Sequence, residues 1–166
     1  MKKLIFSTVL YNTPLEDLKR LLDSIDSLSI EFMKSKVNIK IEKLLIIDNS
    51  INPEYFPENL LKKKYSFKVV LLKSKENLGY GMGHNQNLLI ENSDKYTWYV
   101  ALNPDIYFLG SQLIGFFEFI ISSVDIYCAA PLIYLPNGNI QYSAKKNPTM
   151  FSLLISRFSF FQKFKF

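Results

Sequence analysis

The amino-acid sequence predicts an α/β fold, with a mostly parallel sheet flanked by helices. Short and nearly continuous apolar runs alternate with segments of helical periodicity, and such runs are typical of strands that are buried on both faces. The 166 residues, of which 48% are hydrophobic, suffice for one substantial core. We expect one domain over residues 1–150, followed by a basic and aromatic tail over residues 151–166.

The first strand and the first helix are expected at the N-terminus. Residues 3–10 form an apolar run rich in β-forming residues. Thr13, Pro14 and Glu16 then match a helix start in which Thr13 is the N-cap, Pro14 the first helical residue and Glu16 the partner in a capping box. Apolar residues follow at helical spacing, namely Leu15, Leu18, Leu22 and Ile25.

Four further strands are expected, over residues 41–47, 67–72, 96–102 and 126–131. One helix is expected over residues 111–122, a second between the Gly-rich segment and Glu91, and a short third over residues 58–64. An Asn137-Gly138 turn between Ile133-Tyr134 and Ile140-Gln141-Tyr142 predicts a hairpin, because Asn-Gly tolerates positive φ.

The composition argues against several classes of protein. The net charge is +5, and the lysine clusters at residues 62–64 and 145–146 do not form a basic stripe with stacking aromatics, so we expect no nucleic-acid partner. Cys128 is the only cysteine, which excludes an internal disulfide and indicates a reducing, cytoplasmic location. Its apolar neighbours predict a buried, inert thiol. No apolar run approaches the roughly 20 residues that span a bilayer.

Polar residues and glycines follow the ends of four expected strands. Tyr11 and Asn12 follow the first strand, and Asp48 follows the second. The glycine-rich segment of residues 77–85 follows the third, and Asn103-Pro104-Asp105 follows the fourth. Ligands of open α/β sheets bind outside the carboxyl ends of the strands. We therefore predict the ligand site at this edge.

Each motif also has a purely structural interpretation, and both interpretations stay open. Asp48 fits a turn, or a carboxylate that accepts a hydrogen bond from a nucleobase N–H. The glycine-rich segment fits a loop-to-helix junction, or a backbone that approaches phosphate; it matches neither a P-loop nor a dinucleotide fingerprint. Asp105 fits a turn, or a ligand of a divalent cation that neutralises a diphosphate. His84, the only histidine, fits a structural role or a ligand contact.

The order of these motifs resembles the inverting family-2 glycosyltransferases of the GT-A fold. The resemblance is closest to their rhamnosyltransferase-like branch, in which Asn-Pro-Asp replaces the more familiar Asp-x-Asp, and it covers residues 4–155. The segments that carry it are Val9-Leu10-Tyr11-Asn12, Leu45-Ile46-Ile47-Asp48-Asn49-Ser50, Asn77-Leu78-Gly79-Tyr80-Gly81-Met82-Gly83-His84-Asn85 and Leu102-Asn103-Pro104-Asp105, continued by Pro131, Asn137-Gly138 and Asn147-Pro148-Thr149.

The resemblance implies that the chain transfers a sugar, with inversion, from a nucleoside-diphosphate sugar such as dTDP-rhamnose to a cell-surface glycan or a lipid-linked glycan. Asp48 would contact the base, Asn103 would face the ribose or the sugar phosphate, and Asp105 would hold Mg²⁺ or Mn²⁺. The other residues implied to line the nucleotide site are Tyr11, Asn12, Asn77, Gly79, Gly83, His84 and Asn85.

The sequence departs from this family in one respect. Family members carry an acidic general base in a second half, where it deprotonates the acceptor hydroxyl. The last acidic residue here is Asp125, which precedes the Asn137-Gly138 hairpin and lies too early to match that base. The catalytic residues are therefore unknown. The alternative function is a truncated, catalytically inactive nucleotide-sugar-binding module, or a protein that docks to a membrane or a partner.

The tail over residues 151–166 has two interpretations. Six phenylalanines and three basic residues fit a contact with an anionic membrane, at its inner face for a cytoplasmic protein. The other interpretation is a segment that packs against a further part of the protein or a partner.

Overall fold

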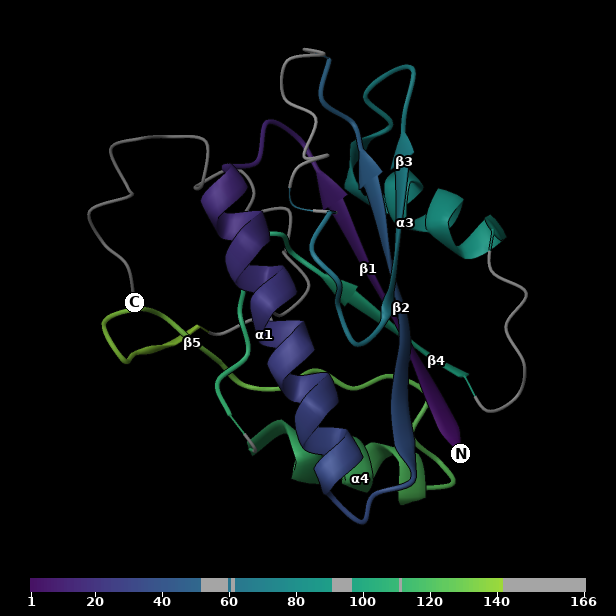
Figure 1. The fold of residues 1–166 in the computed structure, drawn as a ribbon, viewed down its shortest axis with the longest axis vertical. Helices are drawn as coiled ribbons and strands as arrows, with labels where there is room; N and C mark the ends of the chain where they lie inside the picture. The colour runs from purple at the N-terminus through teal and green to yellow at the C-terminus, as the bar shows by residue number, and fades with distance from the viewer. Residues whose placement is uncertain (52–59, 61, 91–96, 111, 142–166) are drawn as a thin grey trace, which may run out of the picture. The chain divides into compact units, whose positions relative to one another are not determined.

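The computed structural model describes residues 1–51, 60, 62–90, 97–110 and 112–141 (Figure 1). The chain divides into two compact units, residues 1–126 and 127–166, and each is described by itself. The expected domain boundary at residue 150 lies outside the described residues, as do the tail and Asn147-Pro148-Thr149. Of the short helix expected over residues 58–64, residues 58, 59 and 61 lie outside them, and residues 62–64 are not helical.

The first unit contains a four-stranded parallel sheet. Its strands are β1 (Lys2–Leu10), β2 (Ile39–Asp48), β3 (Lys68–Lys73) and β4 (Thr97–Leu102), and their order in the sheet is β3-β2-β1-β4 (Figure 1). Each strand lies within about two residues of its predicted bounds, which is the ordinary uncertainty of an element's end. The predicted fold class is confirmed: the unit is α/β and Rossmann-like, with helices packed on the sheet.

The strand order defines where the connections of the chain diverge. From β1 the chain moves outward to β2 and β3, and then returns to the other side of β1 as β4. This reversal between β1 and β4 is a topological switch point, and the crevice outside the carboxyl ends of the strands at such a point is the usual ligand position in open α/β sheets.

Side chains of β1 alternate between two faces of the sheet, as the pleat of a strand requires. Leu4, Phe6 and Leu10 join the main hydrophobic cluster together with α1 (Leu15–Lys34) and α4 (Gln112–Ser122). Ser7 and Val9 face α3 (Gly79–Ile90) instead, where Ser7 bonds to His84 and Val9 lies against Gly83. The helices therefore cover both faces, with α3 on the face opposite α1 and α4.

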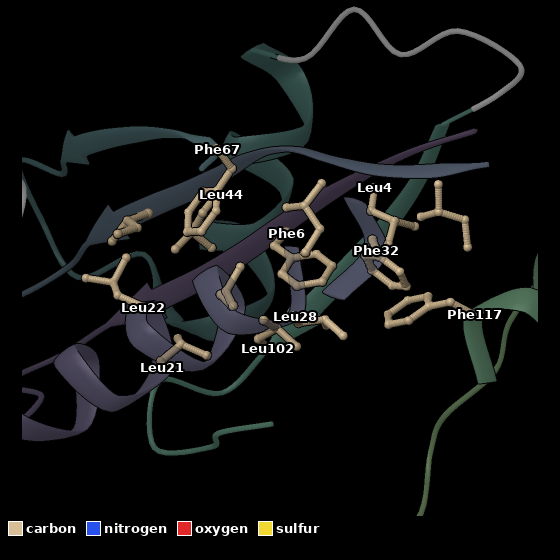
Figure 2. Packing of buried hydrophobic residues seen from close by; sticks show 14 of the residues in the cluster. Leu4, Phe6, Leu21, Leu22, Leu28, Phe32, Leu44, Phe67, Leu102 and Phe117 are labelled. Carbon is tan, nitrogen blue, oxygen red and sulfur yellow. The ribbon is translucent and has the colours of Figure 1, made fainter. Parts of the chain in front are cut away.

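The hydrophobic cluster is anchored by aromatic side chains. Phe6 of β1 and Phe32 of α1 are almost fully buried and both pack against Phe117 of α4, with ring centroids 6.2 and 5.7 Å from it (Figure 2). Leu102, the last residue of β4, belongs to the same cluster. The packing of Leu102 therefore fixes the end of β4, and with it the point at which the following residues leave the sheet.

α1 begins one residue later than predicted, and the predicted capping box is wrong. Pro14 is the N-cap, and no side chain caps the helix. The Thr13 hydroxyl accepts a hydrogen bond from the Tyr11 N–H at 3.3 Å, so it is turned back toward β1 and away from the helix. Glu16 and Asp17 lie in the first turn, where acidic residues interact favourably with the helix dipole.

α3 forms despite a composition that disfavours helix. Three of its first five residues are glycine, and each glycine in a helix interior costs about 1 kcal/mol relative to alanine. Two features compensate. The Asn77 side chain accepts a hydrogen bond from the Gly79 N–H at 2.9 Å, and Gly83, His84 and Asn87 are buried against the sheet. The helix therefore depends on its packing.

Thr8 offers a test of the packing on the other face of β1. Its side chain is fully buried and its hydroxyl has no hydrogen-bond partner among the described residues. We predict that Thr8→Val raises the free energy of unfolding by about 1 kcal/mol, because valine has nearly the same shape and no polar group to desolvate. Thr13→Val is the matched control and is expected to lower it, since the Thr13 hydroxyl has a partner. Urea denaturation measures the change in the free energy of unfolding for both variants. A destabilised Thr8→Val would contradict the prediction.

The second unit contains the predicted hairpin. β5 (Ile133–Tyr134) pairs antiparallel with β6 (Ile140–Gln141), and Gly138 has a φ of +81°. The Asn137 side chain accepts a hydrogen bond from the Asn139 N–H at 3.0 Å, which is typical turn chemistry of asparagine. The prediction is confirmed as far as Gln141, the last described residue.

Two predictions for the region before the hairpin are wrong. Residues 126–131 do not form a strand, because they pair with no strand of either described sheet and residues 127–131 are exposed. Cys128 is exposed for the same reason, whereas a buried thiol was expected. An apolar run is therefore insufficient to define a strand without a partner for its backbone groups.

Within the described ranges, every helix is either too short or too polar to cross a lipid bilayer.

Candidate functional site

The segment Asp48-Asn49-Ser50 lies at the centre of the carboxyl edge of the sheet. The Asn49 N–H donates to the Leu10 carbonyl of β1 at 2.9 Å, and the Ser74 N–H donates to the Asp48 carbonyl at 2.9 Å. The Ser50 hydroxyl accepts from the Asn12 N–H at 2.8 Å, where Asn12 has a left-handed backbone with a φ of +49°. Asparagine tolerates this conformation better than most residues. The segment thus ties together the ends of β1, β2 and β3.

The same segment holds the start of α3. The Asn49 side-chain amide donates to the Gly79 carbonyl at 3.1 Å. Gly79 has a φ of +72°, which explains a glycine at this junction, and nothing surrounds the position of a Cβ there. Asn49, Ser50 and backbone groups therefore connect four of the predicted site residues, namely Asp48, Asn12, Asn77 and Gly79.

Two buried oxygens in this segment have no hydrogen-bond partner among the described residues. Asp48 is 1% exposed, and its Oδ1 accepts from the Ser50 N–H at 2.9 Å while Oδ2 accepts nothing. Asn49 is 2% exposed, and its Oδ1 is equally unpartnered. A buried polar atom without a partner costs about 1–3 kcal/mol, more for a charged group, so each such atom requires an explanation, and a bound ligand is one. A turn explains the hydrogen bond that Asp48 Oδ1 accepts, but it does not explain why Oδ2 is buried without a partner.

Gly83 has a packing role. A Cβ at this position would lie 2.8 and 2.9 Å from the two Cγ methyls of Val9 and 3.1 Å from a methyl of Ile47. Only glycine lets α3 approach the sheet this closely. That Gly83 lines the nucleotide site stays a prediction; its packing sets the position of the N-terminal turn of α3.

His84 lies in a buried polar cluster with residues of β1, α3 and β4. Its Nδ1 is 2.8 Å from the Ser7 hydroxyl, which also accepts from the Asn87 side-chain amide at 2.8 Å. The Tyr99 hydroxyl donates to the His84 carbonyl at 3.1 Å. Burial lowers the pKa of His84, so its ring is neutral at pH 7. This arrangement favours the structural interpretation of His84.

Tyr80 connects this cluster with the end of β4. Its ring lies against His84 with centroids 4.5 Å apart, and half of the side chain is exposed. Burial, and then the negative charge of Asp105, raise the pKa of the Tyr80 hydroxyl. The carboxylate of Asp105 is therefore electrostatically coupled to the start of α3.

The remaining predicted site residues are exposed at this edge. Tyr11 is 51% exposed, and Asn85, Asn103 and Asp105 are exposed as well. Asn103 directly follows β4, as predicted. The structure brings none of these four side chains into a hydrogen bond with another described residue, so they are accessible to a ligand.

Asp105 fits a cation only as one ligand among several. In the described part of the chain, no group of three or more His, Cys, Asp or Glu side chains is placed to hold a metal. Asp105 offers exposed carboxylate oxygens, the ligand type that Mg²⁺ prefers. The residues present therefore fit a cation that a diphosphate would coordinate at the same time, and do not form a complete metal centre.

Sequence reasoning omitted several residues that organise the site. Asn49 and Ser50 were part of the motif around Asp48 but had no assigned role. The sequence carries one signal for Ser7 and Asn87: a serine within an apolar strand, and an asparagine at helical spacing from His84. A polar residue at an expected core position requires a partner.

No model of a protein family matches the chain, and neither do the curated proteins or the solved structures with which it was compared.

Proposed function

We propose that the carboxyl edge of the sheet binds a nucleoside-diphosphate sugar and that this site serves glycosyl transfer with inversion to a glycan or lipid-linked glycan. The observation that carries the proposal is the Oδ2 atom of Asp48, which is buried, without a described partner and located beside the switch point of the sheet. The sequence resemblance supports the same site.

Asp48 would recognise the base. A carboxylate oxygen only accepts hydrogen bonds, so its partner on the ligand is an N–H group. Uracil, thymine and guanine present such a group at a ring nitrogen, whereas cytosine has an acceptor there and offers N–H groups only at its exocyclic amine. Asp48 therefore favours UDP-, dTDP- or GDP-sugars over CDP-sugars, and Tyr11 and Asn12 lie exposed beside it.

The first turn of α3 would face the diphosphate. Backbone N–H groups and the positive end of the helix dipole attract anions there. Gly81 lies in this turn, is exposed and has open space at its Cβ position, so the backbone is accessible. A diphosphate close to Asp105 would suffer repulsion between like charges, and a divalent cation between them removes that repulsion. Mg²⁺ or Mn²⁺ would also neutralise the charge that develops on the leaving diphosphate.

Asp105→Asn tests the cation role. With Mg²⁺ present, we expect wild-type protein to bind the donor about tenfold more tightly than in EDTA, and the variant to gain nothing from the metal. In EDTA the variant should bind at least as well as wild type, because a negative charge near the diphosphate is gone. Calorimetry under both conditions measures this. A full metal effect in Asp105→Asn would contradict the role of Asp105.

The base that would deprotonate the acceptor is not assigned to a residue, so binding and transfer are tested separately. Calorimetry with UDP-, dTDP-, GDP- and CDP-sugars tests the binding proposal: at least one of the first three should bind, and CDP-sugars should bind much more weakly. Absence of binding by all of them would refute it. Binding without release of nucleoside diphosphate in any assay would indicate a binding module in place of a transferase.

A cytoplasmic location belongs to the same proposal, because Cys128 is the only cysteine of the chain. A peripheral contact of residues 151–166 with the membrane would bring the protein to a lipid-linked acceptor.

A further inference from the structure

The side-chain amide of Asn49 has one defined orientation. Its Nδ2 donates to the Gly79 carbonyl at 3.1 Å, and a carbonyl only accepts hydrogen bonds, so the NH₂ group faces Gly79. The backbone of the same residue is held as well, because the Asn49 N–H donates to the Leu10 carbonyl at 2.9 Å. Oδ1 is thus the one polar atom of this side chain that has no partner among the described residues.

Asn49 Oδ1 requires a hydrogen-bond donor. The residue is 2% exposed, so bulk water does not satisfy the oxygen, and a buried acceptor without a partner is unfavourable. An amide oxygen accepts hydrogen bonds and donates none. A phosphate oxygen of a nucleotide sugar is an acceptor as well, so it cannot be the partner. The partner is a hydroxyl or an N–H group.

Asn49 lies between the two ends of the proposed donor site. On one side it follows Asp48, whose Oδ2 would accept from the base. On the other side its amide is bonded to Gly79, the first residue of α3, and the first turn of this helix would face the diphosphate. In a nucleoside diphosphate the ribose connects the base with the diphosphate, and its hydroxyls are the only hydrogen-bond donors of that connection. Position and chemistry therefore both match Asn49 Oδ1 with the ribose.

The approach to the Asn49 amide is open at Gly79. This glycine is exposed, and nothing lies within 4 Å of its Cβ position. Tyr80, the next residue, is half exposed. A hydroxyl that enters beside Gly79 therefore displaces no packed side chain.

We propose that Asn49 Oδ1 accepts a hydrogen bond from the 2′-hydroxyl of the donor ribose, and that the site selects ribonucleoside-diphosphate sugars over 2′-deoxy ones. The 2′-carbon adjoins the carbon that bears the base, as Asn49 adjoins Asp48, which favours this hydroxyl over the 3′-hydroxyl. UDP- and GDP-sugars are then preferred to dTDP-sugars. This inference rests on the proposed donor site and narrows its class of ligand.

The first test compares two ligands that differ in one hydroxyl. Calorimetry with Mg²⁺ measures the affinities of UDP-glucose and 2′-deoxy-UDP-glucose, or of GDP-mannose and its 2′-deoxy analogue if guanine is the preferred base. We expect the ribose form to bind about tenfold more tightly, because the 2′-deoxy form leaves a buried acceptor without a partner.

Three results are possible besides the expected one. Equal affinities would overturn the inference and leave the donor site standing, and this is the result if a trapped water molecule satisfies Oδ1. A loss of affinity confined to the 3′-deoxy analogue would overturn it as well. Absence of binding by both ribose forms would refute the donor site itself.

Asn49→Leu tests whether this residue is responsible for the preference. Leucine has nearly the same shape and no acceptor, so the ratio between the two affinities should fall from about ten to within about twofold of one. The substitution also removes the hydrogen bond to the Gly79 carbonyl. That loss weakens both ligands alike and cancels in the ratio. An unchanged ratio in Asn49→Leu would overturn the inference.

Two control variants separate Asn49 from its surroundings. The Asn77 side chain accepts from the Gly79 N–H at 2.9 Å, so Asn77→Ala disturbs the same end of α3 and leaves the Asn49 amide in place. Both affinities should fall in Asn77→Ala, and the ratio should stay near ten. Asn103→Ala tests the competing residue, which is exposed directly after β4. A ratio that survives in Asn49→Leu and disappears in Asn103→Ala would assign the 2′-hydroxyl to Asn103 and contradict the inference.

Discussion

Asp48→Asn is expected to weaken binding of UDP- or dTDP-sugars by about 100-fold, or roughly 2.7 kcal/mol. The asparagine oxygen can still accept from the Ser50 N–H, as Asp48 Oδ1 does at 2.9 Å. Its NH₂ group then replaces the unpartnered Oδ2 and places a donor opposite the N–H of the base. The change is nearly isosteric, so the melting temperature should change little.

The same substitution should alter the preference among bases. The introduced NH₂ group suits the ring acceptor of cytosine, so the affinity ratio between UDP- and CDP-sugars should fall, which a general loss of folding cannot produce. Asp125→Asn is the matched control: this carboxylate is exposed and should change neither affinity. Unaltered binding of UDP- and dTDP-sugars by Asp48→Asn would rule out base recognition by Asp48.

Gly83→Ala is expected to destabilise the protein by about 1–3 kcal/mol, the usual cost of overpacking a close contact. The added Cβ would meet both methyls of Val9 within 3.0 Å, and a β-branched side chain in a strand has little freedom to move aside. The start of α3 should be displaced as well, so donor binding should weaken. Thermal and urea denaturation measure the stability.

Gly81→Ala is the control within the same helix. Nothing lies within 4 Å of a Cβ at Gly81, so alanine there should be neutral or stabilise the helix by up to about 1 kcal/mol. Val9→Ala combined with Gly83→Ala should recover part of the loss, because the clash is with the Val9 methyls. Equal stability of Gly81→Ala and Gly83→Ala would contradict the packing role of Gly83.

The strands of the sheet were predictable because their apolar runs are bounded by polar residues that cannot continue a buried strand. Asp48 ends one run and Asn103 another, and both boundaries are close to the observed ends of β2 and β4. The run from Ile126 to Pro131 has the same character, but no strand of the described residues pairs with it. A single sequence gives no information on pairing, so the two cases look alike.

The candidate site was predictable in position and less so in chemistry. The carboxyl edge follows from the strand ends alone, and Asp48, Asn12, Asn77 and Gly79 do meet there. The contacts that connect them depend on side-chain directions that a sequence does not specify. Thr13 illustrates this: its spacing fits a helix cap, yet its hydroxyl is turned to the Tyr11 N–H.

The most direct test of the donor site is the set of backbone amide signals that shift when UDP-glucose or dTDP-glucose is added with Mg²⁺. The account predicts that the largest shifts occur at the carboxyl edge of the sheet, in the segments 10–12, 48–50, 77–81 and 103–105. A contradictory result would be the absence of shifts with both ligands, or shifts confined to the opposite edge, where Met1, Phe32 and Val37 line a hollow beside α1.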